Sequence, residues 1–291
     1  MIDYLVWISK LLLLSNLFII SLCGLVNPEF DNGETHKYIF IIDQRYGGTW
    51  LTTLLREQVM QRNDPIIHIE GELFKKSDAR PDVCDRIMKE FFHSPKCEGR
   101  KICAFRMPYF VWPSCDMIQL GIKEQITFIH VIRENKIDWM MSHGVATELR
   151  NNMKSMNLSA AQVMHCKEGE KCYADEVSKI RLLPIPSIQL MREQQALDRN
   201  ISFALQKANV RYRSFQYEDI VVMGTSIILD FMGINVTETN QTATTKFKKR
   251  ITRSQSEVIE NYHHFVKFVR RTEFRWYLDY CIHNIGKPEH C

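Results

Sequence analysis

Short apolar runs alternate with amphipathic stretches along most of the chain. The apolar runs are typical of strands that are buried on both faces of a sheet, and they cover residues 38–42, 65–69, 102–107, 126–132 and 211–216. The amphipathic stretches carry apolar residues at helical spacing, and they predict helices over residues 49–61, 82–92, 138–152, 188–208, 226–232 and 254–269. This alternation predicts an α/β fold with a central, mostly parallel sheet flanked by helices.

The amino terminus has a different pattern. Residues 11–26 form a nearly unbroken apolar run, and with residues 4–8 the apolar stretch is long enough to cross a bilayer, which takes about 20 residues. We therefore expect a signal anchor over residues 1–26, a short polar stem over 27–36 and a lumenal domain over 37–291. A cleaved signal peptide is the alternative. Either reading sends the rest of the chain into the secretory pathway.

Length and charge narrow the possible classes. A chain of 291 residues suits one large α/β domain with a well-buried core. Hydrophobic residues make up 45% and charged residues 25% of the chain, a composition typical of a globular protein. The net charge of +4 is too small to indicate a nucleic-acid partner, although it suits a small anionic ligand in a local basic pocket.

Cysteines and glycosylation acceptors also favour a lumenal protein. Acceptor tripeptides begin at Asn157, Asn200, Asn235 and Asn240, and such sites are glycosylated in secreted proteins. Outside the apolar segment the cysteines form an even set: Cys84, Cys97, Cys103, Cys115, Cys166, Cys172, Cys281 and Cys291. In an oxidising lumen they are expected as disulfides, with buried free thiols as the alternative. Short spacing favours the pairs Cys166–Cys172 and Cys281–Cys291. No C-x₂-C pair suggests a zinc site.

The turn between the first strand and its helix reads QRYGGTWL, residues 44–51. Its two glycines allow close approach of the backbone to a ligand, and the helix start presents free N–H groups and a positive dipole end. Arg45 adds a positive charge and Thr49 a hydroxyl donor. We interpret this turn as a phosphate-binding loop, with a glycine-rich connection as the alternative. The G-x₄-G-K-[ST] pattern of nucleotidases is absent.

This loop resembles the 5′-phosphosulfate-binding loop of P-loop-like sulfotransferases, often written [PK]-[RK]-S-G-T-T-W-L. The matching positions are Arg45, Gly47, Thr49, Trp50 and Leu51, and the departures are Gln44, Tyr46 and Gly48. The resemblance implies that residues 45–50 bind the donor PAPS (3′-phosphoadenosine 5′-phosphosulfate), with Arg45 neutralising charge on the leaving group. At Tyr46 a bulky ring replaces a small hydroxyl, and we expect this ring beside the phosphate.

A second segment resembles the same family. The run FIHVIR, residues 128–133, ends in Arg133 and precedes a helix that carries Ser142 nine positions later, similar to the R-E-N-K-L form of carbohydrate and bacterial-type members. In the family this Arg and Ser hold the 3′-phosphate of PAPS, a task that suits a bidentate guanidinium. The alternative is that Arg133 only caps the edge of the sheet.

Two later segments extend the resemblance over residues 37–280. The run YEDI, residues 217–220, resembles a Y-E-D-L motif that closes a late strand, and we expect its acids to cap the next helix. The basic run over residues 246–253 matches the position of a mobile loop over the 3′-phosphate. The resemblance implies donor contacts there from Lys248, Lys249 and Arg250. A solvated charged face is the alternative.

The acceptor hydroxyl needs a general base. Cytosolic sulfotransferases use a His in a K-x-H-x-P segment, and Arg106 stands at that position here. Carbohydrate-type members use a carboxylate soon after the second strand, and IEGELF, residues 69–74, is similar to their G-E-x-F segment. Glu72 is therefore the predicted base, with Glu70 in reserve. Alternatively, both are surface acids in a loop. His68 lies in a strand pattern and is expected to be structural.

Together these resemblances imply a metal-independent sulfotransferase that moves a sulfuryl group from PAPS to a carbohydrate hydroxyl. The expected location is the Golgi membrane, as a single-pass type II protein with a lumenal catalytic domain, or outside the cell if the segment is cleaved. The expected partners are a carbohydrate acceptor and the membrane, with no nucleic acid. Two alternatives stay open: a glycan-binding relative without catalysis, and a lumenal P-loop kinase.

Overall fold

A parallel sheet forms the centre of the protein. The computed structural model describes residues 35–61, 67–152, 179–234 and 254–279. In this part the sheet has five strands in the order β2-β3-β1-β4-β5, and every pair is parallel. The strands are β1 His36–Ile42, β2 Ile67–Glu72, β3 Ile102–Met107, β4 Thr127–Ile132 and β5 Tyr212–Gln216. The predicted α/β class with a parallel sheet is confirmed.

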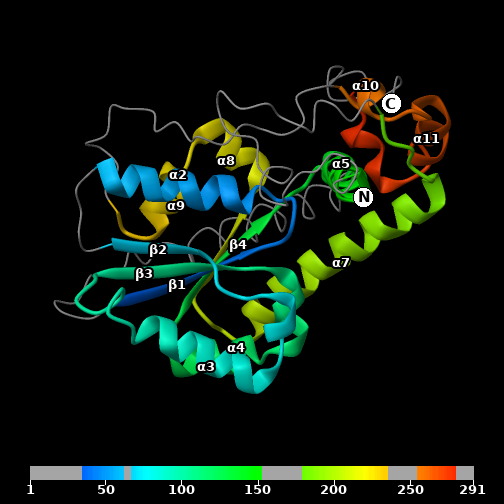
Figure 1. Ribbon diagram of the computed structural model, residues 1–291. Coiled ribbons are helices and arrows are strands. Elements are labelled where there is room, and N and C mark those ends of the chain that lie inside the picture. The colour runs from blue at the N-terminus through cyan, green and yellow to red at the C-terminus, as the bar shows by residue number, and fades with distance from the viewer. Residues whose placement is uncertain (1–34, 62–66, 153–178, 235–253, 280–291) are drawn as a thin grey trace, which may run out of the picture.

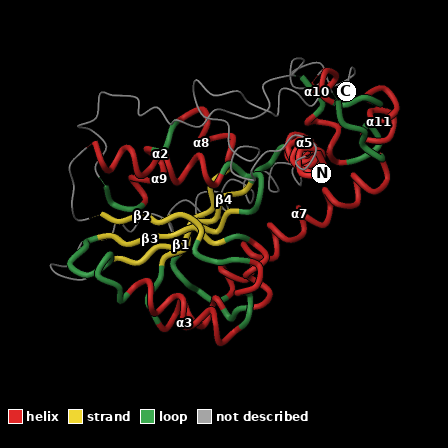
Figure 2. Tube along the Cα trace, viewed as in Figure 1, coloured by secondary structure: helices red, strands yellow, loops and turns green. Residues whose placement is uncertain are grey.

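Helices cover both faces of this sheet (Figure 1). One face carries α2 Gly48–Gln61, α8 Tyr217–Met223 and α9 Ser226–Phe231, and the opposite face carries α3 Pro81–Phe92 and α4 Met117–Lys123. The tube view shows the same layers, with the strands between two groups of helices (Figure 2). This double cover explains why Tyr38 to Ile42 of β1 are almost completely buried.

A long helix connects the sheet to a second group of helices. Helix α7, Pro184–Lys207, contacts β5 and extends to α5, Lys136–Asn152, and α11, Tyr262–Val269. The short helix α10, Gln255–Val258, packs against α5 and α11. The helix expected over residues 254–269 is thus two helices. They are separated because Ile259 forms an isolated parallel bridge with Ile180.

The carboxyl ends of the parallel strands meet at one edge of the sheet, where such folds bind their ligands. Because β1 and β4 are neighbours, with Ile42 opposite Val131, the segments that follow them lie side by side. Strand β2 extends to Glu72, so this residue ends the strand instead of following it. A register shift between Ile69 and Glu72 places Glu72 opposite Arg106 of β3.

Two disulfides stabilise the β3 side of the sheet. Cys84 of α3 is bonded to Cys115, and Cys97 is bonded to Cys103 of β3, with Cα–Cα distances of 6.0 Å and 5.5 Å. The expectation of disulfides is confirmed for these residues. The other two predicted pairs, Cys166–Cys172 and Cys281–Cys291, lie outside the described residues.

Several other predictions also fall outside the described part. These are the apolar segment over residues 1–26, most of the predicted stem, and the basic run with Lys248, Lys249 and Arg250. Within the described ranges, every helix is too short or too polar to cross a bilayer.

Candidate functional site

The loop between β1 and α2 has an unusual backbone. Arg45 and Gly47 both adopt left-handed conformations, with φ of 70° and 75°, which is uncommon for a residue with a side chain. Glycine is needed at position 47 for a second reason, because an added Cβ would lie 2.4 Å from Cε2 of Tyr217. The group that approaches this glycine closely is therefore an aromatic ring from the start of α8.

Helix α2 begins directly after this loop with free backbone donors. The first helical hydrogen bond runs from the Leu51 N–H to the Gly47 carbonyl at 2.9 Å. The N–H groups of Gly48, Thr49 and Trp50 have no acceptor among the described residues. An anion at this end of the helix would meet both these donors and the positive end of the helix dipole.

Arg106 connects this helix start to the predicted base. Its Nη1 donates to the Thr49 hydroxyl at 3.1 Å, and its Nη2 forms an ion pair with Glu72. The guanidinium also packs on Gly48, because a Cβ added there would lie 2.6 Å from Nη1. Its Nε is buried and has no partner in the described part. The residue that stands in place of a histidine thus joins the loop to Glu72.

Glu70 faces a different set of charges. Its carboxylate pairs with Arg56 of α2 at 2.7 Å and with Lys96 at 3.1 Å, and it accepts the Gly71 N–H at 3.0 Å. Burial raises the pKa of Glu70, but the Gly71 and Lys96 hydrogen bonds outweigh it and hold this pKa below its usual value. Between the two candidate carboxylates, only Glu72 is next to the loop.

Arg133 lies on the other side of the loop, directly after β4. Its side chain is nearly buried, and its Nη1 donates to the Arg45 carbonyl at 2.9 Å. The guanidinium lies over the Tyr217 ring at 5.2 Å, and Nη2 is 3.7 Å from Asp138. Ser142 is half-buried on α5, and its side chain makes no hydrogen bond within the described residues, so contacts do not link it to Arg133.

The acids of the YEDI segment lie in the first turn of α8. The Glu218 carboxylate accepts the backbone N–H groups of Glu134 and Asn135 at 3.0 Å and 3.1 Å. Glu218 therefore fixes the residues that lead into α5, a helix earlier in the chain, and does not cap the helix that follows it. These bonds keep the β4–α5 turn in place beside the loop.

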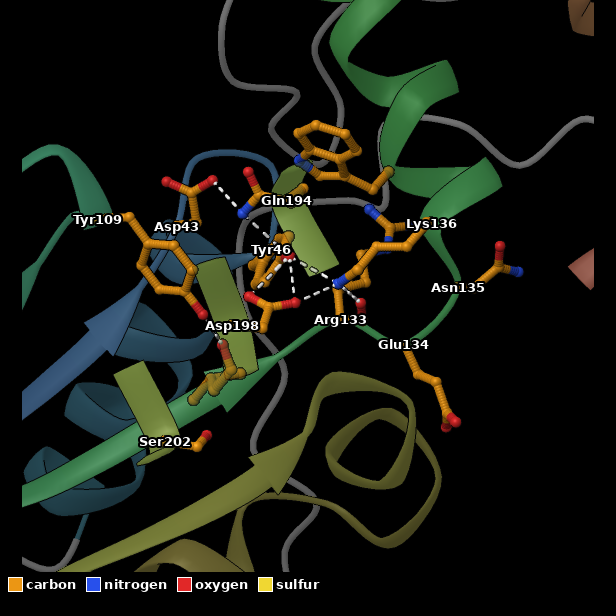
Figure 3. Close-up of polar contacts among 12 residues, drawn as sticks. Asp43, Tyr46, Tyr109, Arg133, Glu134, Asn135, Lys136, Gln194, Asp198 and Ser202 are labelled. Carbon is orange, nitrogen blue, oxygen red and sulfur yellow. Dashed lines mark hydrogen bonds and ion pairs between the residues drawn. The ribbon is translucent and has the colours of Figure 1, made fainter. Parts of the chain in front are cut away.

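Tyr46 points into the protein interior (Figure 3). Its ring is fully buried, and its hydroxyl donates to Asp198, with oxygen distances of 3.0 Å and 3.1 Å. The same hydroxyl accepts from Lys136 Nζ at 2.7 Å and from Gln194 Nε2 at 3.2 Å. We expected this ring beside a bound phosphate; in the structure, buried polar partners on α5 and α7 hold its hydroxyl inside.

We call Asp43, Tyr46, Lys136, Gln194 and Asp198 the buried polar cluster. Lys136 Nζ is 2.5 Å from Asp198 Oδ2, and these side chains are 1% and 4% exposed. Gln194 Nε2 also donates to Asp43 at 2.8 Å. Burial lowers the pKa of Lys136 and raises the pKa of Asp198, and it raises the pKa of Asp43 to about 6. Because the groups are desolvated together, each depends on its hydrogen bonds to the others.

A buried histidine extends this cluster. His130 of β4 lies between the Tyr109 hydroxyl, at 2.5 Å, and the Ser202 hydroxyl of α7, at 3.0 Å. The Tyr109 ring meets the Tyr46 ring edge-on with centroids 5.7 Å apart. Burial lowers the pKa of His130 to about 3, so the imidazole is neutral near pH 7. The only sequence signal for this residue was a histidine inside an apolar strand.

A cavity of about 380 Å³ adjoins the buried polar cluster between α7 and the ends of β4 and β5. Lys136 and Asp198 form part of its wall, together with Ile132, Glu134, Gln195, Arg199, Ser202, Phe203, Gln206, Gln216 and Tyr277. The cluster therefore separates this cavity from the β1–α2 loop. No group of His, Cys, Asp or Glu within the described residues could hold a metal ion.

Comparisons with known proteins give little beyond this geometry. No family model and no curated protein matches the chain. Among solved structures, the chain is similar to a sulfotransferase domain from the curacin biosynthetic pathway, with 11% sequence identity and a TM-score of 0.36. The match covers 76% of this chain and 81% of that domain. At this level the similarity carries no argument about function, which depends on the residues themselves.

Proposed function

We propose that this protein transfers a sulfuryl group from PAPS to a hydroxyl of a carbohydrate. One observation carries the proposal: the free N–H groups at the start of α2 lie beside Arg106, which also holds the Glu72 carboxylate. A site for an anionic donor and a candidate base are thereby next to each other. The motif resemblances of the loop and of the Arg133 segment support the same chemistry.

The residues present fit the charged groups of PAPS. The N–H groups of Gly48, Thr49 and Trp50, with the Arg106 guanidinium, suit the 5′-phosphosulfate. Arg133, on the β4 side of the loop, suits the 3′-phosphate, and its Nε has no partner in the described part. Contributions to the 3′-phosphate from Ser142 and from Lys248, Lys249 and Arg250 stay predictions, as does the role of Arg45 in neutralising leaving-group charge.

The proposed reaction forms one sulfur–oxygen bond and breaks another. The acceptor oxygen bonds to sulfur while the bond from sulfur to the bridging oxygen breaks, and that electron pair leaves with the 3′,5′-bisphosphate. The acceptor proton passes to Glu72, whose Oε1 has no partner among the described residues. Arg106 lies next to both groups and stabilises negative charge that develops on the leaving phosphate.

The proposed location of the protein and the proposed class of acceptor are supported by other features. The apolar segment over residues 1–26 and the glycosylation acceptors support a lumenal Golgi protein. The disulfides Cys84–Cys115 and Cys97–Cys103 support an oxidising compartment. Glycans are the hydroxyl-rich molecules expected there. A glycan-binding protein without catalysis is the second candidate, and the ion pair that already occupies one Glu72 oxygen favours it.

The test is incubation of the full-length protein with labelled PAPS and a panel of glycans. Glu72→Gln should leave PAPS binding close to wild type and lower the transfer rate by roughly two to four orders of magnitude, because the proton acceptor is lost. Glu70→Gln is the matched control, since Glu70 pairs with Arg56 and Lys96 away from the loop, and it should retain transfer.

Three results would separate the candidates. A wild-type protein that does not bind PAPS contradicts the sulfotransferase proposal. Glycan binding that needs no nucleotide and gives no sulfated product supports the second candidate. Wild-type transfer by Glu72→Gln means that the base is another residue.

A further inference from the structure

We propose that Tyr46, Lys136 and Asp198 form an anchor that holds the β1–α2 loop in its ligand-binding conformation before any ligand arrives. The loop's role in donor binding rests on the proposed function, but the anchor itself is a property of the free protein. In this account Tyr46 and its partners are positioning residues: they fix the backbone that binds the donor and do not touch it.

The loop needs such an anchor because its backbone is unfavourable by itself. Tyr46 stands between Arg45 and Gly47, which are both left-handed. A residue with a side chain adopts this conformation only where its surroundings impose it. The loop's own turn provides one weak support, a hydrogen bond of 3.3 Å from the Tyr46 N–H to the Asp43 carbonyl.

The Tyr46 side chain supplies the missing restraint. Its hydroxyl makes one donated and two accepted hydrogen bonds, and its ring is completely buried. Movement of this hydroxyl is unfavourable, since it would cost the desolvated Lys136 and Asp198 one hydrogen bond each, although their ion pair would remain.

The anchor joins three elements that are distant in the sequence. Tyr46 comes from the loop, Lys136 from the start of α5 and Asp198 from α7. Lys136 Nζ also donates to the Arg133 carbonyl, while Arg133 Nη1 donates to the Arg45 carbonyl. The β4–α5 segment therefore holds the loop at two points. Lys136 bonds to the Tyr46 side chain, and Arg133 bonds to the carbonyl of the preceding residue, Arg45.

The anchor also accounts for the departure of this loop from the pattern that it resembles. A serine at position 46 would be too short to reach α7, where Asp198 is buried. The tyrosine reaches Asp198 and leaves the outer side of the loop to the backbone N–H groups and to Arg106. A tyrosine at this position therefore supports the loop from the inside, which a small polar residue would not do.

The experiment compares Tyr46→Phe with Tyr38→Phe by hydrogen exchange of the ligand-free full chain. Both changes delete one hydroxyl from a fully buried tyrosine, but the Tyr38 hydroxyl is 3.4 Å from the Met232 carbonyl, away from the loop. The probe is the Leu51 amide, which bonds to the Gly47 carbonyl. After correction for global stability, Tyr46→Phe should speed its exchange by at least about tenfold, because it removes all three hydrogen bonds of the hydroxyl and one buried hydrogen bond alone is worth about that factor, and Tyr38→Phe should not.

A second measurement tests the consequence for binding. The dissociation constant for adenosine 3′,5′-bisphosphate should rise about tenfold in Tyr46→Phe and stay near wild type in Tyr38→Phe. With saturating acceptor and varied PAPS, kcat should change less than the KM for PAPS, because the anchor fixes the binding conformation and takes no part in the transfer.

The outcomes separate the anchor from the proposed function. Equal exchange of Leu51 in the two variants refutes the anchor, even if the protein transfers sulfate. A wild-type protein that does not bind the bisphosphate refutes the proposed function, and the exchange comparison still decides on the anchor. If Tyr46→Phe does not fold, Gln194→Met, which removes one donor to the same hydroxyl, takes its place in the comparison and is read by the same criterion.

Discussion

Acid should destabilise this protein through His130, and the structure sets both the sign and the size of the effect. Burial lowers the pKa of His130 from 6.5 to about 3. Between these values the unfolded chain binds a proton at this imidazole and the folded chain does not. The stabilising contribution is therefore fully present above pH 6.5 and is lost as the pH falls, by about 1.4 kcal/mol per pH unit.

Asp43 opposes this slope. Burial raises its pKa from 3.8 to about 6, so the folded chain holds a proton that the unfolded chain has lost. This contribution is present at low pH and disappears as the pH rises through about 6. Between about pH 3.8 and 6 the two pH dependences nearly cancel. The curve of wild-type stability against pH therefore reveals the titration of neither group.

A substitution separates them. His130→Gln keeps an amide nitrogen near Tyr109 but removes the titrating group, while Asp43 is unchanged. Between about pH 7.5 and pH 4.5, the free energy of unfolding of wild type should fall relative to this variant by about 2.7 kcal/mol, a large part of a typical total of about 5–15 kcal/mol.

Urea unfolding followed by tryptophan fluorescence at a series of pH values measures this difference. The slope m should be the same for both proteins, so that midpoints can be compared. If the two stability curves run parallel from neutral pH to acid, His130 is charged or solvated in the folded protein. The reasoning about its burial between Tyr109 and Ser202 would then be refuted.

Two further predictions concern buried charges and donor recognition. Asp198→Leu leaves Lys136, which is 1% exposed, without its counter-ion, and should lower the free energy of unfolding by about 3–5 kcal/mol. The double variant with Lys136→Met should recover most of this loss in urea unfolding, and no recovery would contradict the pairing argument. Wild type should bind adenosine 3′,5′-bisphosphate more tightly than 5′-AMP by calorimetry, and Arg133→Ala should lose most of that preference. Equal wild-type affinities would show that Arg133 does not bind the 3′-phosphate.

Much of the sheet could be predicted from the sequence because its strands are continuous apolar runs. Strand β3 matches its predicted range, and β1, β4 and β5 differ by one or two residues at their starts. Helix α4 was missed because its seven residues are too few to show a periodic pattern. Strand β2 was displaced toward its carboxyl end, since a register shift carries it past Ile69 to Glu72.

The candidate site was predictable where strand order alone brings residues together. Parallel strands place the β1–α2 loop, Glu72 and Arg133 at one edge, so motifs that follow separate strands meet there. Side-chain contacts between residues that are distant in the sequence could not be predicted in this way. Tyr46 and Asp198 are separated by 152 positions, and Asp198 is one polar residue within an amphipathic helix. Arg106 was visible only as a residue in the place of a histidine.

The inward orientation of Tyr46 has a consequence for the evolutionary history of this loop. Replacement of Tyr46 by serine would empty a buried volume and leave Lys136 and Asp198 to share a desolvated charge pair without the phenol, so this replacement would be selected against as a single step. Positions 46, 136 and 198 should therefore covary among orthologues, with an acid on α7 accompanying the tyrosine. A residue in an exposed loop would in this way be constrained by residues of the core.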